Sequence, residues 1–201
     1  MKNIKLLLAV CATFLFGTCC NGQQPNFDLV FCELQGPVKT CDYYEFDRSG
    51  RLVSVDGIDP FTLESPTREF DTVTFDFTDV CKWIRNDKGQ ISTIECYEGI
   101  QEFTWSDGRV KESIAYFEAQ KTLTVNEYDA QGRIVKQTLY NGMEDEDVES
   151  KDDSMFFATI EYTYLEFDSH GNWIRRIVKW SDPISDYVDE QEEPRNIKYY
   201  E

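Results

Sequence analysis

The chain carries a short turn signature five times, and no other feature of the sequence restricts its fold as strongly. In each copy an Asp or Asn precedes a Gly by one to three positions, and an apolar residue stands two positions after that Gly. The glycines lie 39, 19, 24 and 39 residues apart, near one or two multiples of a period of about 20 that is typical of repeat proteins. The copies occupy residues 46–52, 85–91, 105–110, 128–134 and 167–173.

The residues of the signature are those that a tight β-hairpin requires. An Asp or Asn side chain accepts hydrogen bonds from backbone N–H groups ahead of it, and Gly adopts the positive φ that ends a three-residue loop. Between the turns, apolar Ile160, Tyr162 and Tyr164 alternate with polar residues, as in a β-strand. We therefore predict an all-β fold, an antiparallel meander of hairpin repeats that forms a twisted, curled sheet.

Departures from this rhythm are also informative. Breaks in the alternation at 57–67, 141–153 and 181–193 contain Pro or many acids and predict surface loops. The copy at 105–110 is one residue shorter than the others, which predicts a tighter turn. Residues 77–85 can be aligned with 167–175 as a sixth, degenerate copy, with Cys81 in the place of Gly171.

The N-terminus has the pattern of a secretion signal. Lys2 and Lys5 precede an apolar run that is shorter than the ~20 residues of a membrane-spanning helix, and small residues follow. We therefore expect residues 1–22 to be a signal and residues 23–201 to form a single extracytoplasmic domain. Two processing routes remain open, lipidation at Cys20 and ordinary cleavage after Gly22. Lipidation would supply the membrane attachment that the rest of the sequence does not.

The charge of the chain bears on its partners. The formal net charge is −18, and loss of the two signal lysines lowers it to −20. Such a charge repels phosphate backbones, so we expect no nucleic-acid partner, and it also disfavours adhesion to anionic lipid. Aromatic residues make up 14% of the chain, which argues for a folded domain rather than a disordered one.

Four cysteines remain after the signal, an even number that suggests disulfides in an exported protein. A two-residue hairpin loop at Gly36-Pro37 would place Cys32 opposite Cys41 as a non-hydrogen-bonded pair, within disulfide range. We therefore predict a Cys32–Cys41 bond. A hairpin around residues 87–89 would pair Cys81 with Glu95, one residue short of Cys96, so the alignment leaves a second bond open.

The repeated signature resembles the YD repeat of RHS-type proteins, whose consensus is Tyr-Asp, two variable residues, Gly-Arg and an aliphatic residue. The resemblance covers roughly residues 43–180 and extends to small secreted RHS-like proteins and lipoproteins of Gram-negative bacteria. It implies a sheet built of hairpins. It supplies no catalytic residues, and this chain is too short to enclose a cargo as the large RHS shells do.

Candidate chemistry in the sequence is sparse. His170, the single histidine, stands at a turn corner and favours a solvated role, and the acidic stretch 144–153 lacks the spacing of a calcium loop. We therefore predict no catalytic, cofactor or metal site. Trp105, Tyr140 and Trp180 stand outside the recurrent apolar position and could stack on a sugar ring or a partner side chain.

These observations favour an exported, non-enzymatic binding module of the cell envelope with a protein or glycan partner, whose ligand the sequence leaves open. An envelope glycoside hydrolase that uses two of the 38 acidic residues is one alternative. A purely structural surface protein is the other.

Overall fold

The computed structural model describes residues 26–70, 77–117, 120–143, 156–182 and 185–201. The expected signal and Cys20 therefore lie outside the described residues, as does nearly all of the predicted loop at 141–153. One helix, α1 (Phe27–Phe31), is present in the described ranges, and all other regular structure is antiparallel strand. None of the described helical structure is long and apolar enough to span a bilayer.

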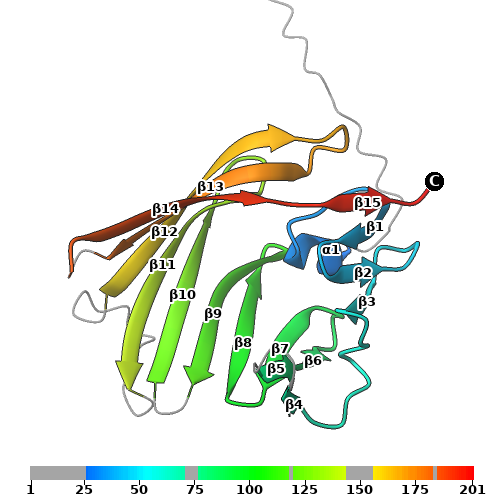
Figure 1. The fold of residues 1–201 in the computed structure, drawn as a ribbon, viewed down its shortest axis with the longest axis horizontal. Helices are drawn as coiled ribbons and strands as arrows, with labels where there is room; N and C mark the ends of the chain where they lie inside the picture. Colours follow the sequence, from blue (N-terminus) through cyan, green and yellow to red (C-terminus); the bar gives the residue numbers. More distant parts are fainter. Residues whose placement is uncertain (1–25, 71–76, 118–119, 144–155, 183–184) are drawn as a thin grey trace, which may run out of the picture.

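The strands of the described residues form three sheets (Figure 1). A four-stranded sheet is formed by β15 (Ile197–Tyr199), β1 (Val38–Cys41), β2 (Tyr44–Phe46) and β3 (Leu52–Val55). A two-stranded sheet joins β4 (Thr67–Phe70) to β5 (Phe77–Val80). The nine-stranded sheet follows chain order through β6 (Lys82–Arg85), β7 (Ile91–Cys96), β8 (Gly99–Ser106), β9 (Arg109–Phe117), β10 (Gln120–Tyr128), β11 (Ile134–Met143), β12 (Phe156–Phe167), β13 (Trp173–Asp182) and β14 (Tyr187–Pro194).

The prediction of an all-β antiparallel meander is therefore confirmed. The large sheet is curled but open, and α1 with the four-stranded sheet lies at the end where its repeat turns gather (Figure 1). The predicted loop at 181–193 is wrong, because most of it forms β14. Its acidic residues conceal the strand from an analysis of hydrophobic alternation.

Four repeat turns share one hydrogen-bond pattern. Oδ1 of Asp47, Asn86, Asp129 or Asp168 accepts the backbone N–H groups two and four residues ahead at 2.8–3.1 Å. The glycine that follows has φ between +79° and +87°. In the shorter copy Asp107 and Gly108 both have positive φ, +53° and +74°, which is a two-residue type I′ turn. The expected tighter turn is thus confirmed.

A β-bulge follows each of the five turns at the same position, three residues after the glycine. The turn-entry residue pairs with the apolar residue two past the glycine, as in Phe46↔Leu52, and the next residue has no partner in the register. The bulge moves the register by one residue and increases the local twist. The unpaired residues are Val53, Ser92, Lys111, Val135 and Ile174.

The bulge at Ser92 explains the disulfide that the structure contains. Beyond it Lys82 pairs with Glu95, so the residues that come next on the two strands are Cys81 and Cys96. These two cysteines are bonded, with their Cα atoms 4.4 Å apart. The simple hairpin alignment was one residue short because it did not include the bulge.

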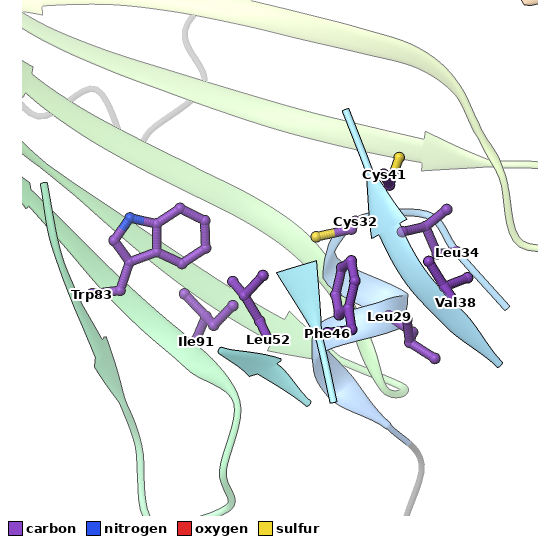
Figure 2. Close-up of a cluster of buried hydrophobic side chains, with 9 residues drawn as sticks. All are labelled: Leu29, Cys32, Leu34, Val38, Cys41, Phe46, Leu52, Trp83 and Ile91. Atoms are coloured by element: carbon purple, nitrogen blue, oxygen red, sulfur yellow. The ribbon is translucent and has the colours of Figure 1, made fainter. Parts of the chain in front are cut away.

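The predicted Cys32–Cys41 disulfide is wrong. Residues 27–31 form α1 instead of a strand, because Asn26 Oδ1 accepts the N–H groups of Asp28 and Leu29 at 3.2 and 3.3 Å and so caps a helix. Cys32 therefore ends a helix, and β1 pairs with β2 and β15. Both cysteines are free, buried thiols of the core cluster (Figure 2).

The sixth copy is also wrong as a hairpin, because Cys81 joins β5 to β6, which belong to different sheets. Trp83 instead enters the core cluster that joins two of the sheets. This cluster joins α1 and the four-stranded sheet to β6 and β7 through buried apolar side chains (Figure 2). Its members are Leu29, Cys32, Leu34, Val38, Cys41, Phe46, Leu52, Trp83 and Ile91.

Alanine substitutions at two turn glycines distinguish the energetic cost of backbone strain from that of steric overlap. A Cβ added at Gly89 would meet no atom within 4 Å, whereas one at Gly50 would lie 2.7 Å from Leu29 Cδ1. Gly89→Ala should therefore lower the free energy of unfolding by about 1–2 kcal/mol. Gly50→Ala should have the same backbone cost and lose about 1–3 kcal/mol more, because its methyl group would overpack the core. Urea unfolding measures both variants, and equal losses would contradict this account of the core.

Cysteine mapping tests the corrected register. Burial raises the pKa of the Cys32 thiol and raises that of Cys41 to about 12, so both thiols are protonated and covered at pH 8. Iodoacetamide should leave them unmodified in native protein and alkylate both in urea. A non-reduced digest should contain a linked Cys81–Cys96 peptide. A linked Cys32–Cys41 peptide would contradict the helical N-terminal segment.

Candidate functional site

The N-terminal segment 26–37 lies against the row of repeat turns at one edge of the large sheet, which we call the turn rim. Glu33 anchors the segment there. Glu33 Oε1 accepts the backbone N–H of Ile134 and the hydroxyl of Tyr164, each at 3.1 Å. Its Oε2 accepts Arg176 Nη1 at 3.0 Å, and only 14% of the Glu33 side chain is exposed. One carboxylate thus connects the segment to β11, β12 and β13.

Asn172 fixes the next part of the segment. This buried side chain follows the turn at Asp168 and accepts the N–H of Gln35 at 2.8 Å. Its Nδ2 donates to the carbonyl of Gln35 at 2.9 Å and to the hydroxyl of Tyr199 at 2.7 Å. Gln35 is therefore held by its backbone, and its side chain amide lies over Gly171, where a Cβ would collide with it.

A pocket of about 230 Å³ opens between the segment and the turns at Asp129 and Asp168. Val30, Leu34 and Trp173 form its apolar wall. Its polar lining is supplied by Glu33, Gln35, Arg109, Gln131, Arg133 and Asn172. The pocket therefore contains two guanidinium groups and one carboxylate, in a chain whose net charge is −18.

The two arginines of this pocket differ in their partners. Arg133 is bound to Asp129 through Nε at 2.6 Å, and its guanidinium lies over the rings of Tyr164 and Phe167. The guanidinium of Arg109 lies over Gly132, at a place that a Cβ on residue 132 would occupy. It also lies 5.3 Å from the ring centre of Tyr128. Within the described part of the chain, Arg109 has no ion pair and no side-chain hydrogen bond.

Tyrosines behind the pocket are held in their neutral form. The Tyr128 hydroxyl donates to the carbonyl of Val110 at 2.6 Å, and burial raises its pKa to about 12, with the charge of Glu33 acting in the same direction. Burial and the neighbouring Glu33 also raise the pKa of Tyr164. Its single hydroxyl hydrogen is shared between Glu33 Oε1 at 3.1 Å and the carbonyl of Ile134 at 2.7 Å. These phenols serve as hydrogen-bond donors that position the strands.

The aromatic residues predicted for stacking do not form one surface. Trp105 donates from Nε1 to the carbonyl of Ile91 at 2.7 Å and packs edge-on against Phe27. Trp180 packs against Phe157 with ring centres 5.9 Å apart. Tyr140 lies on the opposite face of the sheet from Trp180, because the registers place Thr138 and Ser181 on its own face.

The remaining sequence candidates lie outside the pocket. His170 is exposed at its turn, as expected, but its ring stacks on Tyr199 with centroids 3.9 Å apart. Residues 144–155 lie outside the described ranges, so the acidic stretch has no structural account. No group of three or more His, Cys, Asp or Glu side chains among the described residues could hold a metal ion.

Sequence analysis missed Glu33 and Arg109. Glu33 carries no local signal, because its partners are 101–143 residues away in the chain. Arg109 did carry one, since it is the Arg that follows the turn glycine in the Gly-Arg pair. Arg51 and Arg133 occupy the same place in their copies, and all three line pockets beside the N-terminal segment.

Comparison with known proteins supplies no assignment. Neither a family model nor a curated protein matches the sequence.

The same substitution at two glutamates tests the anchor. Glu33→Gln leaves buried Arg176 with Glu193 as its remaining acid, so the free energy of unfolding should fall by about 3 kcal/mol. Glu161→Gln removes a 3.7 Å pair between exposed side chains and should cost about 0–1 kcal/mol. Urea unfolding of both variants makes the comparison, and equal effects would exclude Glu33 as the anchor.

Proposed function

We propose that this protein is an exported binding module and that the pocket between the N-terminal segment and the turn rim receives a carboxylate group of its ligand. The observation that carries the proposal is Arg109, a guanidinium in the pocket wall without an acidic partner in the described chain. Other exposed cations, such as Lys39 and Arg48, also lack an ion pair with any described residue. The proposal therefore rests on the position of Arg109, whose guanidinium lines a pocket and lies beside the Tyr128 ring.

The chemistry of Arg109 suits a carboxylate. A guanidinium presents parallel N–H donors that match the two oxygens of a carboxylate, and the planar group also lies against the Tyr128 ring. Gln35 and Gln131 add amide groups to the same lining, which can bond hydroxyl or peptide groups of a ligand. The volume of about 230 Å³ fits a terminal sugar or residue rather than a larger ligand.

The local charge must outweigh the overall charge of the chain. A net charge of −18 repels an anion at long range, and salt screens this repulsion over a Debye length of about 8 Å at physiological ionic strength. The contact with Arg109 is partly enclosed and therefore less screened. We expect weak binding, in the millimolar to micromolar range, that moderate salt does not abolish.

Export is the second part of the proposal. The N-terminal pattern of residues 1–22 supports it, and so does the Cys81–Cys96 disulfide, since such bonds persist in oxidising compartments. Lipidation at Cys20 and cleavage after Gly22 remain alternative routes to the same side of the membrane. Four turns with one hydrogen-bonding scheme, and one bulge position shared by all five turns, support membership of the YD-repeat group as part of this proposal.

The two-carboxylate hydrolase is less well supported. Four pockets formed by described residues are each lined by a single carboxylate, from Glu33, Asp56, Asp28 or Glu98. A glycosidase of that type requires two carboxyl groups about 5–9.5 Å apart across one cleft.

Paired probes test the proposed pocket. Glucuronate should bind more tightly than glucose, and N-acetylalanine more tightly than its amide, and the stronger pair identifies the source of the carboxylate. NMR titration or calorimetry measures the affinities. Arg109→Gln should weaken binding tenfold or more, since a bond to a charged group contributes about 1.5–3 kcal/mol.

Lys88→Gln is the matched control, because it removes the same charge from an exposed turn residue outside the pocket. It should leave the affinity unchanged. Binding of both members of each pair with equal affinity, or retention of affinity in Arg109→Gln, would contradict the proposal.

A further inference from the structure

β14 forms an open edge of the nine-stranded sheet. It pairs with β13 over eight consecutive residue pairs, and no described strand pairs with its other side. Seven of its eight residues are exposed, and Tyr187 and Val188 are 56% and 60% exposed despite their apolar character. An open edge of this length is a template for pairing with another chain.

The register shows which backbone groups face outward. Arg195 donates its N–H to the carbonyl of Ile174 at 2.9 Å, which makes Arg175↔Pro194 a non-hydrogen-bonded pair. From there, hydrogen-bonded and non-hydrogen-bonded pairs alternate along the two strands, and both Arg176↔Glu193 and Asp182↔Tyr187 are hydrogen-bonded. Val188, Glu190 and Glu192 therefore direct their N–H and C=O groups away from β13.

The edge is strongly acidic, with five acids between residues 186 and 193. Arg175 and Arg176 pair with Glu192 and Glu193 at 3.2 and 2.6 Å. Asp189 and Glu190 have no ion pair with any described residue. Two β14 edges brought together would place these acids against one another, so the charge opposes pairing with a second copy of the chain.

We propose that β14 accepts an extended, basic segment of another protein by β-strand addition. The outward groups of Val188, Glu190 and Glu192 would supply the main-chain hydrogen bonds. Lysines or arginines of the incoming strand would lie beside Asp189 and Glu190, and an apolar residue beside Val188. This proposal is independent of the pocket, because it uses a different element and the opposite charge.

The acids could instead serve only to block edge pairing, as charged residues often do. The two roles differ in whether a basic strand forms backbone hydrogen bonds or is merely attracted by charge. The probe is therefore a nine-residue peptide of lysine, valine and threonine with a charge of about +4. Its control has the same sequence and charge but carries N-methyl groups on alternate residues, which removes the donors that would face β14.

Amide hydrogen exchange followed by NMR gives the readout. With the parent peptide, the amides of Val188, Glu190 and Glu192 should exchange at least tenfold more slowly, while the already paired amide of Gln191 changes little. The N-methylated peptide should produce no such protection. Equal binding of both peptides without protection of these amides, or no binding of either, would overturn the proposal.

Glu190→Pro provides the matched variant of the protein. It removes one outward N–H and leaves the hydrogen bonds to β13 in place, and proline is tolerated at this position of an edge strand. The variant should lose protection by the peptide while its Gln191 amide keeps the exchange rate of the unmodified protein. Retained protection of Val188 and Glu192 at full affinity would place the peptide elsewhere.

Discussion

In four of the five repeat turns, one side-chain oxygen accepts two backbone N–H groups, and the arrangement of the sheet depends on these two hydrogen bonds. The Asp or Asn closes the turn, the glycine takes the positive φ, and the bulge three residues later moves the register by one. The same step recurs at each repeat turn and adds local twist there, although in β12–β13 a second irregularity at Leu165 returns the register. It also decides single contacts: without the bulge at Ser92, Cys81 would face Glu95 and not Cys96.

A curled sheet of this kind must still cover its inner side. At the turn end the cover is the N-terminal segment, which adds apolar contacts through α1 and a charged anchor through Glu33. Farther from the turns, polar side chains satisfy one another across strands, since Gln137 donates to Asn126 at 2.8 Å and accepts from Tyr162. Apolar burial is therefore concentrated at one end of the molecule, and the pocket lies where the cover meets the rim.

The features that sequence analysis predicted are local, and those it missed are not. A hairpin is specified by a few consecutive residues, so the turns and the antiparallel meander could be predicted. The prediction of a Cys32–Cys41 hairpin was wrong because Asn26 and Asp28 favour the start of a helix. This signal is as local as the Gly36-Pro37 turn signal, and the structure follows the helix signal. Glu33 could not be recognised, because its partners on β11 to β13 are adjacent to it only after the sheet has curled. β14 was missed because its pairing partner β13, and not its own pattern, makes it a strand.

Arg176 links the pocket to the open edge. It donates to Glu33 at 3.0 Å and to Glu193 at 2.6 Å, while its guanidinium lies 4.1 Å from the ring centre of Trp173. With 11% of its side chain exposed, it is surrounded by groups that bind it on both sides. Glu193 is consequently neutralised within the sheet, and the charge that an incoming strand meets at the edge comes from Asp189 and Glu190. The same arginine is the ion-pair partner of Glu33 in the pocket, where Arg109 has no ion pair with a described residue. One buried arginine thus pairs with an acid at each of the two surfaces, Glu33 in the pocket and Glu193 on β14.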